Sequence, residues 1–87
     1  MIFTSHAKTR MEEYGIKEDG VEETVREPEK LFLDIKTGRL IAIMKYGEKH
    51  LVVVYESNEE IVIVTVFSTS KINKIVENRV RNGRLGL

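Results

Sequence analysis

Four apolar residues near the start of the chain recur three or four positions apart: Phe3, Ala7, Met11 and Tyr14. This spacing places them on one face of a helix, for which Thr4 or Ser5 is a favourable N-cap and Gly15 a favourable C-terminal residue. A second, shorter helix is predicted over residues 18–26, where acids crowd the first turn and Pro28 prevents continuation. The first third of the chain is therefore expected to be helical.

Beyond Pro28 the spacing of apolar residues changes from helical to alternating, as in a β-strand. Short polar or glycine-containing segments interrupt the alternation and indicate turns, which leaves four predicted strands at residues 31–35, 40–46, 50–56 and 61–67. Strands joined by such short connections pair antiparallel. The middle of the chain therefore predicts an antiparallel meander of three to four strands.

The last two predicted strands are apolar on both faces. In the third strand the two groups are Leu51, Val53 and Tyr55 on one face and Val52 and Val54 on the other. In the fourth strand the expected groups are Ile61, Ile63 and Phe67 on one face and Val62, Val64 and Val66 on the other. A half-exposed antiparallel strand would alternate apolar with polar residues, so we expect these two strands to be central and covered on both faces.

A third helix is predicted after residue 67, with possible caps at residues 68–70 and an end at Gly83. Its apolar stripe is formed by Ile72, Ile75, Val76 and Val80. The opposite side carries a polar, basic row formed by Lys71, Lys74, Asn78 and Arg81. Residues 1–87 are therefore predicted to form one α+β domain with two N-terminal helices, the meander and a C-terminal helix.

Composition narrows the classes of function. The 87 residues include no cysteine, which excludes disulfides and a thiol nucleophile. Two histidines forty-four positions apart do not predict a metal site, and neither a glycine-rich phosphate loop nor a G-x-S-x-G nucleophile elbow is present. No apolar run is long enough for a membrane span, so a cytoplasmic protein without metal or cofactor is expected. The abundance of Lys, Glu, Arg, Ile and Val resembles a thermophile's composition.

The formal net charge is zero, but the charges are segregated along the chain. Residues 12–30 contain eight acids and three bases, whereas residues 69–87 contain five bases and one acid. A neutral chain with this distribution can still attract an anionic partner to its basic part. The alternative interpretation is a solvated helix face at each end.

His6 and Arg10 are the candidate catalytic residues. They lie four positions apart on the first helix, so their side chains can meet, and a neighbouring cation disfavours protonation of a histidine. A neutral histidine suits a general base. The alternative is a local ion pair between Arg10 and Glu13, with His6 at the rim of the core.

A second group of candidates could bind RNA. His50 opens the third strand and lies near Lys45 if the hairpin closes at Gly47, while Lys71, Lys74 and Arg81 belong to the basic row. These residue types suit metal-free cleavage of RNA, in which a base deprotonates the ribose 2′-hydroxyl, an acid protonates the leaving oxygen and Lys or Arg stabilises the phosphate charge. The alternative for His50 is an ordinary residue at a strand edge.

The pattern F-x-x-H-A-x-x-R-M-x-E-x-G-I at residues 3–16 resembles a family of small uncharacterised prokaryotic domains with an H-A-x-x-R helix. The L-V-V-V-Y and I-V-I-V-T-V strands are similar to its two central strands. That family is similar in layout to the BrnT toxins and, more distantly, to the RelE/ParE toxin superfamily. The chain departs from BrnT-type sequences at residues 65–68, where those sequences carry a basic residue in a small-residue motif.

The resemblance implies a toxin-like protein that cleaves RNA without metal and is neutralised by a small helical antitoxin. The alternative is a non-catalytic module of the same fold that binds protein or nucleic acid. Because a helix with four apolar side chains covers only part of so wide a sheet face, we also expect a homodimer or a hetero-complex. A monomer would require the third helix to lie squarely across the sheet, with Leu85 and Leu87 filling the gap.

Overall fold

The computed structural model of the chain describes residues 1–81 and 85–86. The elements follow in the order β1 (Ile2–Phe3), α1 (Ser5–Tyr14), α2 (Glu18–Arg26), β2 (Lys30–Asp34), β3 (Leu40–Tyr46), β4 (Lys49–Ser57), β5 (Ile61–Thr69), α3 (Ile72–Arg81) and β6 (Leu85–Gly86). The predicted α+β class and the order of the three helices and four main strands are confirmed. The predicted helix end at Gly83 lies outside the described residues.

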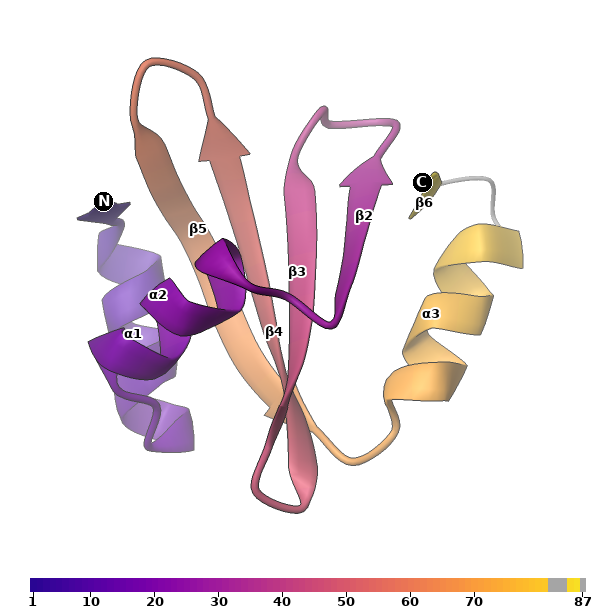
Figure 1. Cartoon of the computed structure of the whole chain (residues 1–87), viewed down its shortest axis with the longest axis horizontal. Coiled ribbons are helices and arrows are strands. Elements are labelled where there is room, and N and C mark those ends of the chain that lie inside the picture. The colour runs from indigo at the N-terminus through magenta and orange to yellow at the C-terminus, as the bar shows by residue number, and fades with distance from the viewer. Residues whose placement is uncertain (82–84, 87) are drawn as a thin grey trace.

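The strands form one mixed sheet with the order β1-β5-β4-β3-β2-β6 (Figure 1). Strands β2 to β5 pair antiparallel as the predicted meander. Two short strands extend it, because β1 pairs parallel with β5 and β6 pairs antiparallel with β2. These two strands were not predicted from sequence, because each is only two residues long and has no alternation to indicate it.

Helix α1 begins and ends where local chemistry favours it. The side chain of Thr4 accepts a hydrogen bond from the backbone N–H of Ala7 at 3.0 Å, which makes Thr4 the N-cap. Gly15 terminates the helix with a φ of 65°, a left-handed conformation that costs a residue without a Cβ little. The chain then turns into α2, where Glu18 and Asp19 occupy the first turn.

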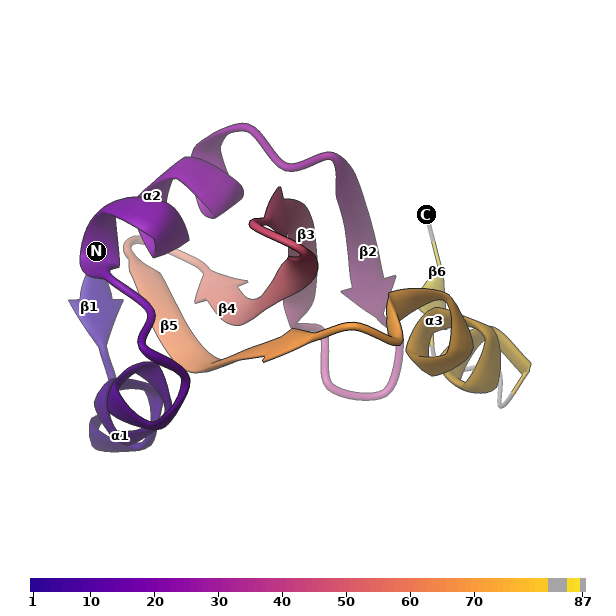
Figure 2. The same ribbon diagram turned by 90° about the horizontal axis from the view of Figure 1, so that it is seen from below.

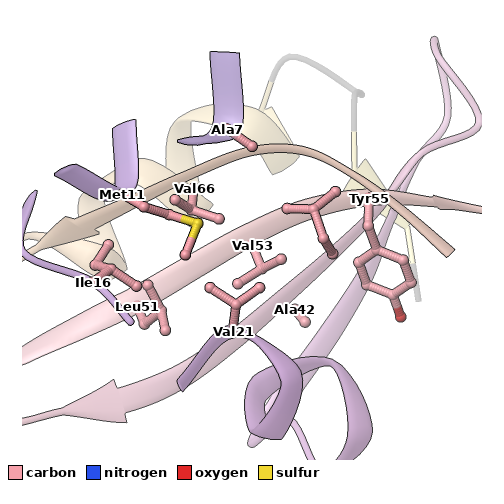
Figure 3. Packing of buried hydrophobic residues seen from close by; sticks show 10 residues of the cluster. Ala7, Met11, Ile16, Val21, Ala42, Leu51, Val53, Tyr55 and Val66 are labelled. Carbon is pink, nitrogen blue, oxygen red and sulfur yellow. The ribbon is translucent and has the colours of Figure 1, made fainter. Parts of the chain in front are cut away.

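Helices α1 and α2 cover one face of the sheet, which we call the α1–α2 face. Helix α1 packs along β5, while α2 packs over β3 and β4. Figure 3 shows the resulting core, in which Ala7, Met11, Ile16 and Val21 meet side chains of the sheet. The buried strand residues of this face are Ala42, Leu51, Val53, Tyr55, Ile63 and Val66.

Helix α3 packs on the opposite face, which we call the α3 face. Ile72 and Val76 of the helix contact a smaller buried cluster formed by Phe32, Ile41, Ile43 and Val52. Figure 2 shows α3 beside β2 and β6, at the other end of the sheet from α1. The cover is incomplete, because Val54, Val62, Val64 and Phe67 are only half-buried. The filling of this gap by Leu85 and Leu87, considered from sequence, concerns side chains outside the described part of the structure.

A β-bulge in β5 corrects the predicted assignment of faces in that strand. Thr65 pairs with Val54 and Ile63 pairs with Tyr55, which leaves Val64 as an extra residue. Beyond this residue the alternation is inverted: Val66 joins Ile63 in the core of the α1–α2 face, and Phe67 packs on the α3 face. The prediction that Phe67 shares a face with Ile63 was therefore wrong.

Candidate functional site

His6 and Arg10, the predicted catalytic pair, lie on the outer side of α1. His6 is exposed, and Arg10 forms an ion pair with Glu13, with a distance of 3.2 Å from its Nη1 to the carboxylate oxygen. Helix α1 turns Ala7 and Met11 into the core, so the flank with His6 and Arg10 faces away from it. The structure therefore has the local ion pair that was the alternative interpretation of Arg10.

Lys45 and His50 are brought together, as the predicted hairpin required. The two residues are directly opposite one another in the register of β3 and β4. Alternation places both on the α3 face, since Ile43 and Val52 belong to the core of that face. Thr69 of β5 is the partner of His50 on the other side. Lys45, His50 and Thr69 therefore form a cross-strand row at one end of the α3 face.

A groove lies beside this row, between α3 and the sheet, and encloses about 510 Å³. Its polar lining comes from three elements or their ends, namely the start of β2, β4 and α3: Glu29, Lys30, His50, Asn73 and Glu77. Its apolar lining is Ile43, Ile72 and Val76. We call it the His50 groove. His50 lines this groove, whereas the hollow of about 590 Å³ beside α1 has no histidine among its lining residues.

Local hydrogen bonds hold the sheet side of the His50 groove in place. The backbone N–H of Glu29 donates to the Ile43 carbonyl at 2.9 Å, and the backbone N–H of Lys45 donates to Glu29 Oε1 at 3.2 Å. Lys30 follows and pairs with Ile43 in the register of β2 and β3. The turn after Pro28 is thereby tied to β3, and it presents Lys30 at the edge of the groove.

The basic row on α3 is exposed as predicted. Lys71 and Lys74 are exposed, as is Asn78, and Asn73 and Glu77 lie one turn apart on the side of the helix that lines the His50 groove. The backbone N–H of Lys71 donates to Thr69 Oγ1 at 3.0 Å, which joins the start of α3 to the His50 row. The backbone of Arg81 ends α3, and its side chain lies outside the described residues.

The predicted site residues fall into two separate groups. Lys45, His50, Lys71 and Lys74 gather at the end of the sheet where α3 begins, whereas His6 and Arg10 lie on α1 at the opposite side of the molecule (Figures 1 and 2). The backbone N–H of Thr4, which leads into α1, donates to Ile63, and Ile63 is six positions before Thr69 in β5. That separation corresponds to roughly 20 Å of strand. The structure does not bring His6 to the RNA-binding candidates.

Four polar residues of the His50 groove had not been singled out from sequence: Glu29, Lys30, Asn73 and Glu77. Glu29 and Lys30 follow Pro28 and resemble ordinary turn residues. Glu77 is the acid in an otherwise basic C-terminal segment, and its position four residues after Asn73 was the available signal. These residues come together because of where α3 packs on the sheet. The spacing of apolar residues in the sequence does not indicate that position.

None of the helices among the described residues is long and apolar enough to cross a membrane. No group of three or more His, Asp or Glu side chains in the same part of the chain is arranged to hold a metal ion.

Comparison with known proteins gives one match. The family described as "Domain of unknown function (DUF4258)" matches residues 3–68, from β1 to the end of the sheet's last long strand. No curated protein and no solved structure matches the chain. The matched region contains Lys45 and His50 and stops before α3, so the helix side of the His50 groove lies outside it.

Proposed function

The chain belongs to the DUF4258 family, and from the surface around the His50 groove we propose that it is a toxin-like protein that acts on RNA. The observation that carries the proposal is the cross-strand pair of Lys45 and His50 beside two exposed lysines, Lys71 just before α3 and Lys74 in its first turn. Cations spaced along one surface favour the phosphate backbone of a nucleic acid. The resemblance to BrnT and RelE/ParE toxins supports RNA as the anion.

The groove favours a single strand over a duplex. A volume of about 510 Å³ is in the range of a pocket for a small molecule, so it accommodates an unstacked nucleotide. Specific recognition of RNA usually targets such unstacked bases. The lysines would then follow the backbone on either side of the nucleotide in the groove.

A small helical antitoxin is the partner that this proposal implies. The half-buried apolar residues of the α3 face, Val54, Val62, Val64 and Phe67, offer a surface for it, and Phe67 is the member nearest to the His50 row. An antitoxin that extended past Phe67 to Lys45 and His50 would also obstruct the approach of RNA. The antitoxin would in that case neutralise the toxin by covering the α3 face, without a conformational change.

RNA affinity measured against salt concentration tests the proposal. For a short fluorescein-labelled single-stranded RNA, each lost phosphate contact lowers the slope of log K against log salt by roughly 0.7. Lys45→Glu and Lys74→Glu should each reduce the slope and the affinity. Lys8→Glu, an exposed lysine of α1 on the other side of the molecule, is the matched control. Equal binding by all four proteins would refute the proposed surface.

The second candidate function is a non-catalytic module of the same fold, and the state of α1 favours it. Arg10 is engaged with Glu13, and His6 is exposed away from the lysines, so the residues predicted to be catalytic are not assembled into a site. Expression in a bacterial host separates the candidates. A toxin-like ribonuclease slows growth and degrades RNA, whereas a binding module does neither.

A further inference from the structure

The His50 groove contains the groups that acid–base cleavage of RNA requires. His50 of β4 is half-buried at one wall, and Glu77 of α3 is exposed at the other. Lys30 of β2 and Asn73 of α3 line the same groove. An imidazole, a carboxylate, an ammonium group and an amide therefore converge on one concavity from three elements that are far apart in the sequence.

We propose that Glu77 and His50 are the general base and general acid of a ribonuclease site in this groove, an assignment that rests on the proposed action on RNA. It replaces His6 as the catalytic histidine. The substrate class is single-stranded RNA with a free ribose 2′-hydroxyl, and Lys30 is placed to contact the phosphate whose charge increases during the reaction.

The reaction is an internal transfer of the phosphate. The Glu77 carboxylate takes the proton of the 2′-hydroxyl, and the 2′-oxygen forms a bond to the adjacent phosphorus. The bond from phosphorus to the 5′-oxygen breaks, and the His50 imidazolium gives its proton to that oxygen. The products are a 2′,3′-cyclic phosphate and a 5′-hydroxyl. Glu77 ends protonated and His50 neutral, and water returns both to their starting states.

Glu77 is favoured as the base over Glu29, the other carboxylate of the groove. Glu29 Oε1 accepts the backbone N–H of Lys45 at 3.2 Å, which commits that oxygen to the turn after α2. Among the described residues, no comparable hydrogen bond holds the Glu77 carboxylate in place. Glu77 also lies on α3, one turn after Asn73, so the helix holds the base and the amide on the same wall.

The charges that face His50 come from three elements or their ends. Lys45 is its cross-strand partner on β3, while Glu29 and Lys30 line the groove from the start of β2 and Glu77 lines it from α3. Thr69 of β5 is the uncharged neighbour on the remaining side. Because Glu77 must be ionised and His50 protonated, the cleavage rate should depend on pH with two limbs.

The test uses the full chain and a short fluorescein-labelled single-stranded RNA in EDTA. Glu77→Gln and His50→Gln should each lower the cleavage rate on the order of 100-fold or more, while anisotropy shows RNA binding within a factor of a few of the parent. Glu77→Gln should remove the acidic limb of the pH profile, and His50→Gln the alkaline limb. Glu12→Gln and His6→Gln, both at exposed positions of α1, are the matched controls and should cleave as the parent does.

The outcomes separate this assignment from the function on which it rests. A parent protein that binds the RNA and leaves it intact overturns the ribonuclease site but not the RNA-binding surface. Cleavage by Glu77→Gln or His50→Gln at the parental rate overturns the acid–base pair. Failure of the parent to bind RNA at all removes the proposed function, and this assignment with it. An RNA with 2′-deoxyribose at the cleaved position should resist cleavage, and its cleavage would contradict the internal transfer.

Discussion

The side chain of Thr4 joins the start of α1 to Val64, the extra residue of the bulge in β5. Its Oγ1 donates to the Val64 carbonyl at 3.0 Å and accepts the backbone N–H of Ala7 at 3.0 Å. The backbone N–H of Thr4 donates to the neighbouring Ile63 carbonyl at 3.1 Å. One residue therefore caps a helix and stabilises the point where the sheet is irregular.

Replacement of Thr4 should show this double role. Thr4→Ala removes the cap and leaves the Val64 carbonyl without its side-chain donor, so the free energy of unfolding should fall by about 1–2 kcal/mol. Thr4→Ser keeps the hydroxyl and should lose much less. Urea denaturation of the three proteins measures the difference. If the serine and alanine variants were equally destabilised, the hydroxyl would not be the stabilising group.

Gly20 in the first turn of α2 is explained by Tyr46 of β3. A Cβ at position 20 would lie 3.1 Å from Cε1 of the Tyr46 ring, which is too close unless the ring moves. Alanine is favoured over glycine inside a helix by about 1 kcal/mol. In the parent protein, Gly20→Ala should therefore not raise the free energy of unfolding by this amount, because the close contact between the new Cβ and the Tyr46 ring opposes it.

A double-mutant cycle tests the pairing of Gly20 with Tyr46. With Tyr46→Leu as the background, Gly20→Ala should stabilise the protein by about 1 kcal/mol. Denaturant unfolding of the four proteins gives the coupling energy. The same change in stability in both backgrounds would show that the ring does not restrict position 20.

Tyr55 makes the stability of the protein sensitive to alkaline pH. Burial raises the pKa of its phenol above the ordinary value of 10.0. The unfolded chain therefore loses the phenolic proton at lower pH than the folded chain does, and the free energy of unfolding falls as pH rises above about 10. Below that pH the phenol is neutral in both states and contributes no pH dependence.

Tyr55→Phe removes this titration while it keeps the ring in the core. Its free energy of unfolding should decline less steeply above pH 10 than that of the parent, with urea midpoints measured from neutral pH upwards. Tyr14→Phe, at an exposed position, is the control and should follow the parent. Parallel curves for the parent and Tyr55→Phe would contradict the assignment to burial.

Self-association is expected from the incomplete cover of the α3 face. Val54, Val62, Val64 and Phe67 remain half-buried in the single chain, so sedimentation equilibrium of the isolated protein should give about twice the chain mass of 10.0 kDa. Val64→Lys should return the mass to that of one chain, and Lys74→Glu should leave it unchanged. A parent mass of one chain would rule out the homodimer and leave a hetero-complex as the way to cover this face.

Much of the fold could be predicted because local signals agree with tertiary packing. The bounds of α2 follow from the acids of its first turn and from Pro28, and the four long strands follow from alternation. The bulge could not be predicted, because residues 61–67 are almost uniformly apolar and contain no glycine to indicate an irregularity. The burial of Phe32 and the exposure of Leu31 and Leu33 run against the alternation, because the side of β2 with Phe32 also carries Lys30 and Asp34 and the other side is apolar.

The candidate site was predictable only as far as it is local. Lys45 and His50 meet because a short turn joins their strands, and this the sequence indicates. The distance between His6 and His50 depends on the sheet order, in which β5 is next to α1 and β4 and β3 follow. The contribution of Glu77 depends on the crossing of α3 over the sheet. Neither the order of the strands nor the position of α3 on the sheet can be inferred from the spacing of apolar residues.

The bulge at Val64 also determines on which face of the sheet each later residue of β5 lies. Because β5 contains one residue more than its partner needs, Phe67 and Thr69 lie on the same side as Val52 and His50, and the chain leaves the sheet on the side where α3 packs. Removal of Val64 would leave a regular strand in which Thr65 still pairs with Val54, so Phe67 and the connection to α3 would keep their face. A relative of equal length without the bulge would instead pair position 64 with position 54 and place Phe67 on the α1–α2 face. Its connection to the last helix would then have to differ by an odd number of residues for the groove to survive.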